Sequence, residues 1–161
     1  MGEPAMITML RRLSLRAPLV AATAFAALAA APLAAQGVST PAEADAEFAD
    51  AMASGVRAST LREAEMCAGY WWALQAVHEA SAEVPFWQNL PKRLGPDTAT
   101  LGREFWNAVL REALKDDEAR LEAAGNRVFD HRQEAIRRVV EAEKTGGIEG
   151  FFSTLGTCVP E

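Results

Sequence analysis

Hydrophobic residues recur every three or four positions along most of the chain after about residue 40, the period of a helix that buries one face. The most apolar of these runs lies between Thr60 and Ser81. Its stripe consists of Leu61, Ala64, Cys67, Tyr70, Trp71, Leu74 and Val77, widened by Ala68, Trp72 and Ala76. A helix that is apolar over more than half its circumference needs neighbours on several sides, so this segment is expected to be the central helix.

Two segments carry the sequence signature of a helix start. Thr40-Pro41-Ala42-Glu43 places Thr at the N-cap, Pro in the first turn and Glu three residues after the cap, and Thr60-Leu61-Arg62-Glu63 repeats the Thr-to-Glu spacing. The first predicts a helix that ends at Ser54-Gly55, and the second begins the central helix.

Residues 83–96 predict an irregular connection. Three prolines, Pro85, Pro91 and Pro96, prevent a long helix there. Phe86, Trp87 and Leu90 make the loop apolar, so it is expected to fold back over the core.

The C-terminal half predicts two or three further helices. The next helix is expected to begin at Asp97 or Thr98 and to bury Leu101, Phe105, Val109 and Leu110, with Trp106 beside them. The later stripe comprises Phe129, Ile136, Val139 and Val140. Gly125-Asn126 lies between the two, and a break or kink there is preferred over one helix of about 45 residues, since a bent chain buries both stripes.

Residues 144–147 form a stop signal, and a last short helix is expected over residues 148–155. No run alternates with the period of two that marks a half-buried strand. The sequence therefore predicts an all-α fold, a small bundle of four or five helices in a single domain over residues 36–161, with a short polar leader at 36–40.

Residues 1–35 read as a secretory signal peptide. Three arginines, Arg11, Arg12 and Arg16, precede an Ala-, Leu-, Val- and Phe-rich run, and small residues follow up to Ala35. Cleavage is expected after Ala35, because the run is shorter than the roughly 20 apolar residues of a membrane span; an uncleaved N-terminal anchor is the alternative. The mature protein is then periplasmic or secreted, with no membrane span left after cleavage.

Charge excludes some partners. The chain carries a formal net charge of −6, which becomes −8 when Glu3 and the three arginines leave with the signal peptide. An acidic domain repels nucleic acid, so nucleic-acid binding is not expected.

The two cysteines, Cys67 and Cys158, are expected to form a disulfide, because an exported protein folds in an oxidising compartment. The bond would join the C-terminal tail to the central helix. It would close a loop of about 92 residues, and two free thiols or a metal pair are the alternatives.

Candidate chemistry is sparse. The aromatic residues belong mainly to the predicted core, but Trp72, Phe86, Trp87 and Trp106 could line a groove, with Trp72 and Trp87 partly exposed. The two histidines, His78 and His131, lack the spacing of a metal site, and no cofactor is predicted. No nucleophile or phosphate-binding motif is present.

These observations favour a non-enzymatic binding or interaction module of the cell envelope, with another envelope protein or component as its partner. A carrier of a small ligand or metal that uses the aromatic groove is the alternative. A hydrolase with paired carboxylates is a third hypothesis, and the sequence does not predict the oligomeric state.

Overall fold

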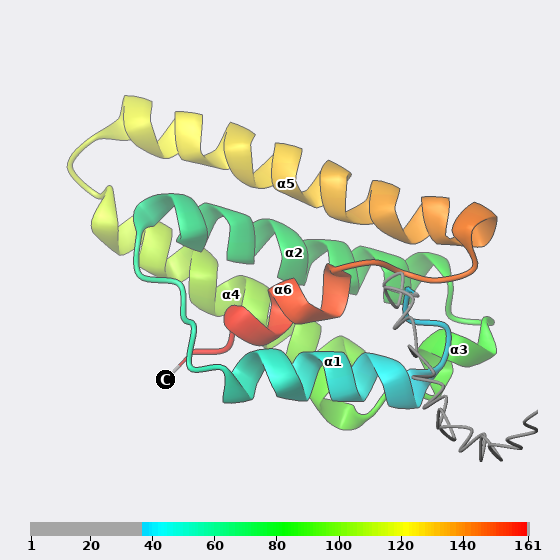
Figure 1. Cartoon of the computed structure of the whole chain (residues 1–161). Coiled ribbons are helices and arrows are strands. Elements are labelled where there is room, and N and C mark those ends of the chain that lie inside the picture. The colour runs from blue at the N-terminus through cyan, green and yellow to red at the C-terminus, as the bar shows by residue number, and fades with distance from the viewer. Residues whose placement is uncertain (1–36, 161) are drawn as a thin grey trace, which may run out of the picture. The chain divides into compact units, whose positions relative to one another are not determined.

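Helices account for most of the computed structural model, which describes residues 37–160 (Figure 1). They are α1 (Pro41–Ala53), α2 (Leu61–Ala80), α3 (Pro85–Gln88), α4 (Pro96–Ala113), α5 (Glu118–Thr145) and α6 (Phe151–Thr157), with a 3₁₀ turn at Lys92–Leu94. Within this part of the chain the only β-pairing is an isolated antiparallel bridge between Val38 and Ile148. The all-α prediction is confirmed; the predicted signal peptide lies outside the described residues.

Helix α2 is the central helix, as its stripe predicted. It packs between α4 on one side and α5 on the other, while α1 pairs with α6 (Figure 1). Every residue of the predicted stripe is buried except Leu61, which is half-buried. Burying such large side chains contributes about 1.5–3 kcal/mol each, so the position of α2 organises the fold.

Two glycines allow the neighbouring helices to approach α2 closely. A Cβ added to Gly69 of α2 would lie 2.6 Å from the Cβ of His131 on α5. A Cβ added to Gly102 of α4 would overlap the buried ring of Trp71. At these two positions the absence of a side chain sets the distance between helices.

Both predicted helix starts are present as complete capping boxes. In α2 the Thr60 hydroxyl accepts a hydrogen bond from the Glu63 backbone N–H, and Glu63 accepts from the backbone N–H of Ser59 and Thr60. These bonds lower the pKa of Glu63 to about 2, with the Ser59 backbone bond as the largest cause.

Replacing Glu63 by Gln is expected to remove part of the pH dependence of stability. A carboxyl whose pKa is lowered on folding stabilises the protein fully above its ordinary value of about 4.5 and loses that effect as the pH falls to about 2. Urea unfolding of both proteins across this pH range should therefore show a higher midpoint for the wild type than for the variant above pH 4.5. This difference should disappear as the pH falls to about 2. The same substitution at Glu104, an exposed residue of α4, is the control, and an excess that persists unchanged in acid would contradict the assignment.

The predicted break at Gly125 is wrong. Helix α5 runs without interruption from Glu118 to Thr145, and the chain turns earlier, between Leu114 and Asp117. Asp117 caps α5 by accepting a hydrogen bond from the Arg120 backbone N–H. Gly125 is exposed with nothing near its missing side chain, so it costs only about 1 kcal/mol relative to Ala, and the buried Ala124 and Val128 hold α5 against the core on both sides of it.

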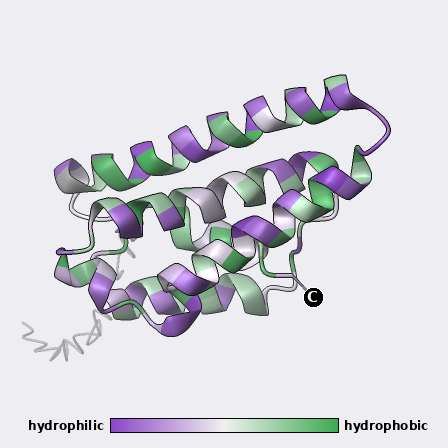
Figure 2. Ribbon diagram, turned by 180° about the vertical axis from the view of Figure 1, so that it is seen from behind, coloured by the Kyte–Doolittle hydropathy of each residue, from purple (hydrophilic) through white to green (hydrophobic). Residues whose placement is uncertain are grey.

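The predicted stripes of the C-terminal half are also partly wrong. Leu101 and Phe105 are 65% and 42% exposed, and Phe129 and Val140 are exposed as well. Helix α4 instead buries Ala99, Gly102, Trp106 and Leu110. At Gly102 the ring of Trp71 approaches so closely that no larger side chain would fit, so Leu101 and Phe105 lie on the outer side of α4. Figure 2 shows how hydrophilic and hydrophobic residues alternate along α5.

The ends of the domain differ from the prediction in one respect. Val38 lies in the segment expected to be a polar leader, yet it is buried and exchanges both backbone hydrogen bonds with Ile148, at 2.9 and 2.8 Å. Because Ile148 is held in this bridge, the last helix begins at Phe151 rather than at residue 148. The proline-rich loop folds back over the core as predicted, and Leu90 and Leu94 are buried.

Candidate functional site

The predicted disulfide is present and joins Cys67 of α2 to Cys158 directly after α6. Both cysteines are fully buried. The tail is held a second time through the Cys158 carbonyl, which accepts hydrogen bonds from the indole N–H of Trp71 at 3.1 Å and of Trp106 at 2.8 Å. Trp106 is therefore part of the packing around the disulfide.

The structure does not bring the four candidate groove residues to one pocket of the described region. Trp106 is buried beside the tail, and Trp72 is half-buried between Phe129 and Arg132. Phe86 and Trp87 lie together on α3, with ring centroids 4.9 Å apart. Trp87 is only 7% exposed, contrary to the predicted partial exposure, because α3 folds onto His78 and Phe152.

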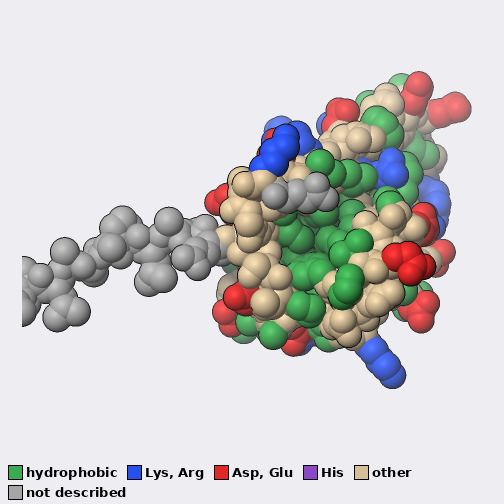
Figure 3. All heavy atoms as spheres, turned by 90° about the vertical axis from the view of Figure 1, so that its right-hand side faces the viewer, with side chains coloured by type: hydrophobic (Ala, Val, Ile, Leu, Met, Phe, Trp, Pro, Cys, Tyr) green, Lys and Arg blue, Asp and Glu red, His purple; other side chains and the backbone are tan. Residues whose placement is uncertain are grey.

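An apolar pocket of about 620 Å³ lies where α2 ends, between α3 and the second half of α5. Figure 3 shows hydrophobic side chains gathered in a hollow of this face, with charged side chains around them. The pocket is lined by Val38, Ser39, Ala76, Val77, Ala80, Ser81, Val84, Phe86, Trp87, Arg132, Ile136, Val139, Val140, Ala142, Gly146, Gly147 and Ile148. We call it the α3–α5 pocket.

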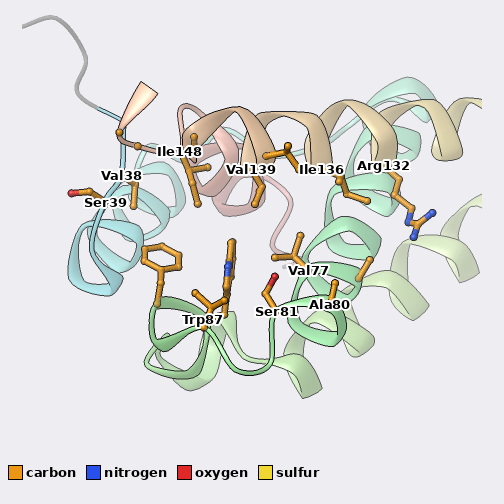
Figure 4. Close-up of a pocket in the computed structure, with 17 residues that line it drawn as sticks. Val38, Ser39, Val77, Ala80, Ser81, Trp87, Arg132, Ile136, Val139 and Ile148 are labelled. Carbon is orange, nitrogen blue, oxygen red and sulfur yellow. The ribbon is translucent and has the colours of Figure 1, made fainter. Parts of the chain in front are cut away.

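Small residues leave the α3–α5 pocket open. Ala76 and Ala80 line it from α2, while Ala142, Gly146 and Gly147 line it from the end of α5, and none of these side chains extends beyond Cβ. The larger groups stand around them: Ile136 and Val139 on the α5 side, and Trp87 on α3 (Figure 4). A cavity of 300–1,000 Å³ with mainly apolar walls is typical of ligand sites.

Arg132 is the single ionisable residue that lines the α3–α5 pocket within the described part of the chain. Its guanidinium carbon lies 4.4 Å from the centre of the Trp72 ring, the geometry of a cation–π contact. Its Nε atom is buried and has no hydrogen-bond partner. Figure 4 shows Arg132 at one end of the pocket and Val38 and Ser39 at the other.

Sequence reasoning missed both the α3–α5 pocket and Arg132. A signal for Arg132 was available, since it precedes Ile136 by four residues and so shares the inward face of α5. The hollow itself had no positive signal, because it consists of alanines and glycines that pack well elsewhere.

The polar groups of the pocket are few. Among the residues that the structure describes, its walls carry two hydroxyls, Ser39 and Ser81, and no carboxylate, histidine or thiol. Elsewhere, His78 lies 2.8 Å from the Leu94 carbonyl through Nε2, so this nitrogen carries the proton and donates. Over residues 37–160 no three His, Cys, Asp or Glu side chains are grouped as metal ligands.

None of the described helices is long and apolar enough to cross a membrane. The candidate site of this chain is therefore the α3–α5 pocket, defined by an apolar trough with one cationic end. No protein-family model, curated protein or solved structure matches the chain.

Proposed function

We propose that this chain is an exported, non-enzymatic binding module of the cell envelope, and that the α3–α5 pocket holds the apolar part of its ligand. The observation that carries this proposal is the pocket itself. It leaves about 620 Å³ of space with mainly apolar walls open to solvent, where the interior of a protein is normally filled by side chains. A ligand that covers these apolar walls is stabilised by about 25 cal/mol for each Å² of apolar surface that it removes from water.

Export is supported by two independent features. Residues 1–35 have the charged, apolar and small-residue parts of a secretory signal, and the disulfide is of the kind that persists in oxidising compartments. We infer that the mature protein works in the periplasm or outside the cell.

A second candidate function is docking of another envelope protein on α4. Leu101 and Phe105 are exposed four residues apart on this helix, and they border an apolar groove of about 460 Å³ with Met52 and Val159. Exposed large apolar residues on one helix face are typical of contact surfaces.

Replacing Val140 by Glu is expected to weaken binding of Nile red, a neutral apolar dye, by at least tenfold. Val140 is an exposed residue of α5 that lines the α3–α5 pocket, so the new carboxylate would lie against the dye and lose water when the dye binds. Fluorescence titration of the purified mature protein measures the change.

Two matched variants decide where the dye binds. Val56→Glu introduces the same charge at an exposed valine outside the pocket and should leave the affinity unchanged. Phe105→Glu places it on the α4 groove. If Val140→Glu binds as wild type does and Phe105→Glu does not, the α3–α5 pocket is the wrong site.

A further inference from the structure

One end of the α3–α5 pocket is cationic, and that charge has no counter-ion in the described part of the chain. Arg132 forms none of the ion pairs that connect other arginines of α5, such as Arg127 with Glu65 or Arg137 with Glu134 and Glu141. Among the described residues, Arg132 is the one arginine of α5 that forms no ion pair, since Arg120 and Arg138 also contact carboxylates.

The guanidinium of Arg132 is held ready for an acceptor. It has five N–H donors, and none of them forms a hydrogen bond to a described residue, although Nε is already removed from water. Stacking on Trp72 at 4.4 Å restricts the plane of the group. An anion that binds there meets the two Nη groups in an orientation that the stacking already restricts, which favours affinity.

The apolar walls begin next to this charge and continue along α5. Arg132 and Ala142 both line the pocket and lie ten residues apart on one helix, which corresponds to about 15 Å at the α-helical rise. Ile136 and Val139 lie between them, opposite Val77, Ala80 and Trp87 (Figure 4). The pocket therefore combines an arginine at one end with an extended apolar trough.

We propose that the α3–α5 pocket binds a monomeric amphiphile with a single acyl chain and one anionic group, the carboxylate being held by Arg132 and the chain lying along α5. This inference rests on the proposed binding function and names its ligand class. The ligand is a free amphiphile rather than a lipid in a bilayer, because the many charges of an anionic membrane surface repel an acidic protein far more strongly than one carboxylate does.

The test compares decanoate with decanol, which share the chain length but differ in charge, below the concentrations at which they form micelles. Isothermal titration of the mature protein at neutral pH should show decanoate binding at least tenfold more tightly than decanol, as expected for a charge-assisted hydrogen bond. Octanoate should bind about fifteenfold more weakly than decanoate, since it lacks two methylenes and each buried methylene changes affinity about fourfold.

Arg132→Gln should bring the affinity for decanoate down to that for decanol and leave decanol binding unchanged. Arg132→Lys keeps the charge but loses the planar donor pair, so it should retain only part of the preference. Arg137→Gln, the same change on the same helix outside the pocket, is the control and should behave as wild type. Circular dichroism checks that the variants fold, and if Arg132→Gln does not, the partial loss in Arg132→Lys carries the test.

The outcomes separate this inference from the proposed function. If Nile red and decanol bind at the Val140-sensitive site but decanoate binds no more tightly, the inference is overturned and the binding function stands. If wild-type protein binds none of the three probes, the proposed function fails as well. Sedimentation with anionic phospholipid vesicles but no binding of free decanoate would also overturn the inference.

Discussion

Replacing Cys67 and Cys158 together by Ala is expected to lower the free energy of unfolding by about 4 kcal/mol. The bond spans a sequence separation of 91 residues, and a cross-link of that length removes much of the conformational entropy of the unfolded chain. Domains of this size are stable by only about 5–15 kcal/mol, so the variant would lose a large fraction of its stability. Its melting temperature should fall by roughly 15 °C.

Urea unfolding measures this loss and also reports its origin. A denatured chain without the cross-link is more expanded, so the variant should show a larger dependence of the unfolding free energy on urea than wild type. Wild-type protein unfolded with a reducing agent is the control, because its thiols keep the native side-chain volume. Equal urea midpoints for the oxidised wild type, the reduced wild type and the variant would mean that the disulfide does not stabilise the fold.

The folded variant should keep its tail packed against the core. Both cysteines are buried, and the two tryptophan hydrogen bonds to the Cys158 carbonyl hold the same end of the chain. These bonds, each worth about 1 kcal/mol, remain possible in the variant and should keep the folded state native-like. Tryptophan fluorescence of the folded variant should therefore resemble that of wild type.

The N-terminal half of the fold could be predicted from sequence because independent signals agreed there. Thr60 and Glu63 mark the start of α2, and its apolar stripe fixes which face is buried. A capping box, a proline and a glycine do the same for α1. Local hydrogen bonding determines these features, so they can be read without the rest of the structure.

The C-terminal half could not be read in the same way. The hydrophobic pattern predicts Leu101 and Phe105 as core residues. However, the contact of Gly102 with the Trp71 ring sets the distance between α2 and α4, so these two larger side chains lie on the outer face. Gly125 resembles a helix end in isolation, but the packing of the buried Ala124 and Val128 on its two sides keeps α5 a single helix. Tertiary contacts decided both outcomes.

The candidate site was the least predictable part. Four aromatic residues were predicted to line a groove, yet Trp72 and Trp106 do not line the α3–α5 pocket. The pocket forms because small residues at the ends of α2 and α5 leave space unfilled. Such a gap produces no hydrophobic periodicity in the sequence. The guanidinium of Arg132 is oriented by Trp72, a residue on another helix, so the sequence around Arg132 does not indicate its role.

A buried ion pair between α2 and α5 was also absent from the sequence-based expectations. Glu65 is 1% exposed, and its two carboxylate oxygens accept hydrogen bonds from Nε and Nη2 of Arg127, both at 2.7 Å. Arg127 itself is half exposed. Removing the Arg127 side chain would leave the Glu65 carboxylate without a partner in the interface between α2 and α5.

Arg127→Met is accordingly expected to lower the free energy of unfolding clearly more than the loss of an exposed ion pair does, because it leaves the buried carboxylate of Glu65 without its partner. The double variant Glu65→Met/Arg127→Met should recover most of that loss because no charge is left buried. Lys115→Met, which breaks an exposed pair with Glu112, should change stability by less than about 0.5 kcal/mol.

The position of this pair explains why α5 tolerates Gly125. Arg127 and the buried Val128 follow the glycine within three residues and attach α5 to α2, and the buried Ala124 directly precedes it. Helix stability at that point comes from contacts on both sides rather than from intrinsic propensity. Arg127→Met should therefore raise the hydrogen-exchange rates of the α5 backbone amides around Gly125 more than those near Val139. Uniform exchange along α5 in the variant would instead show that the ion pair stabilises the whole helix and not this segment.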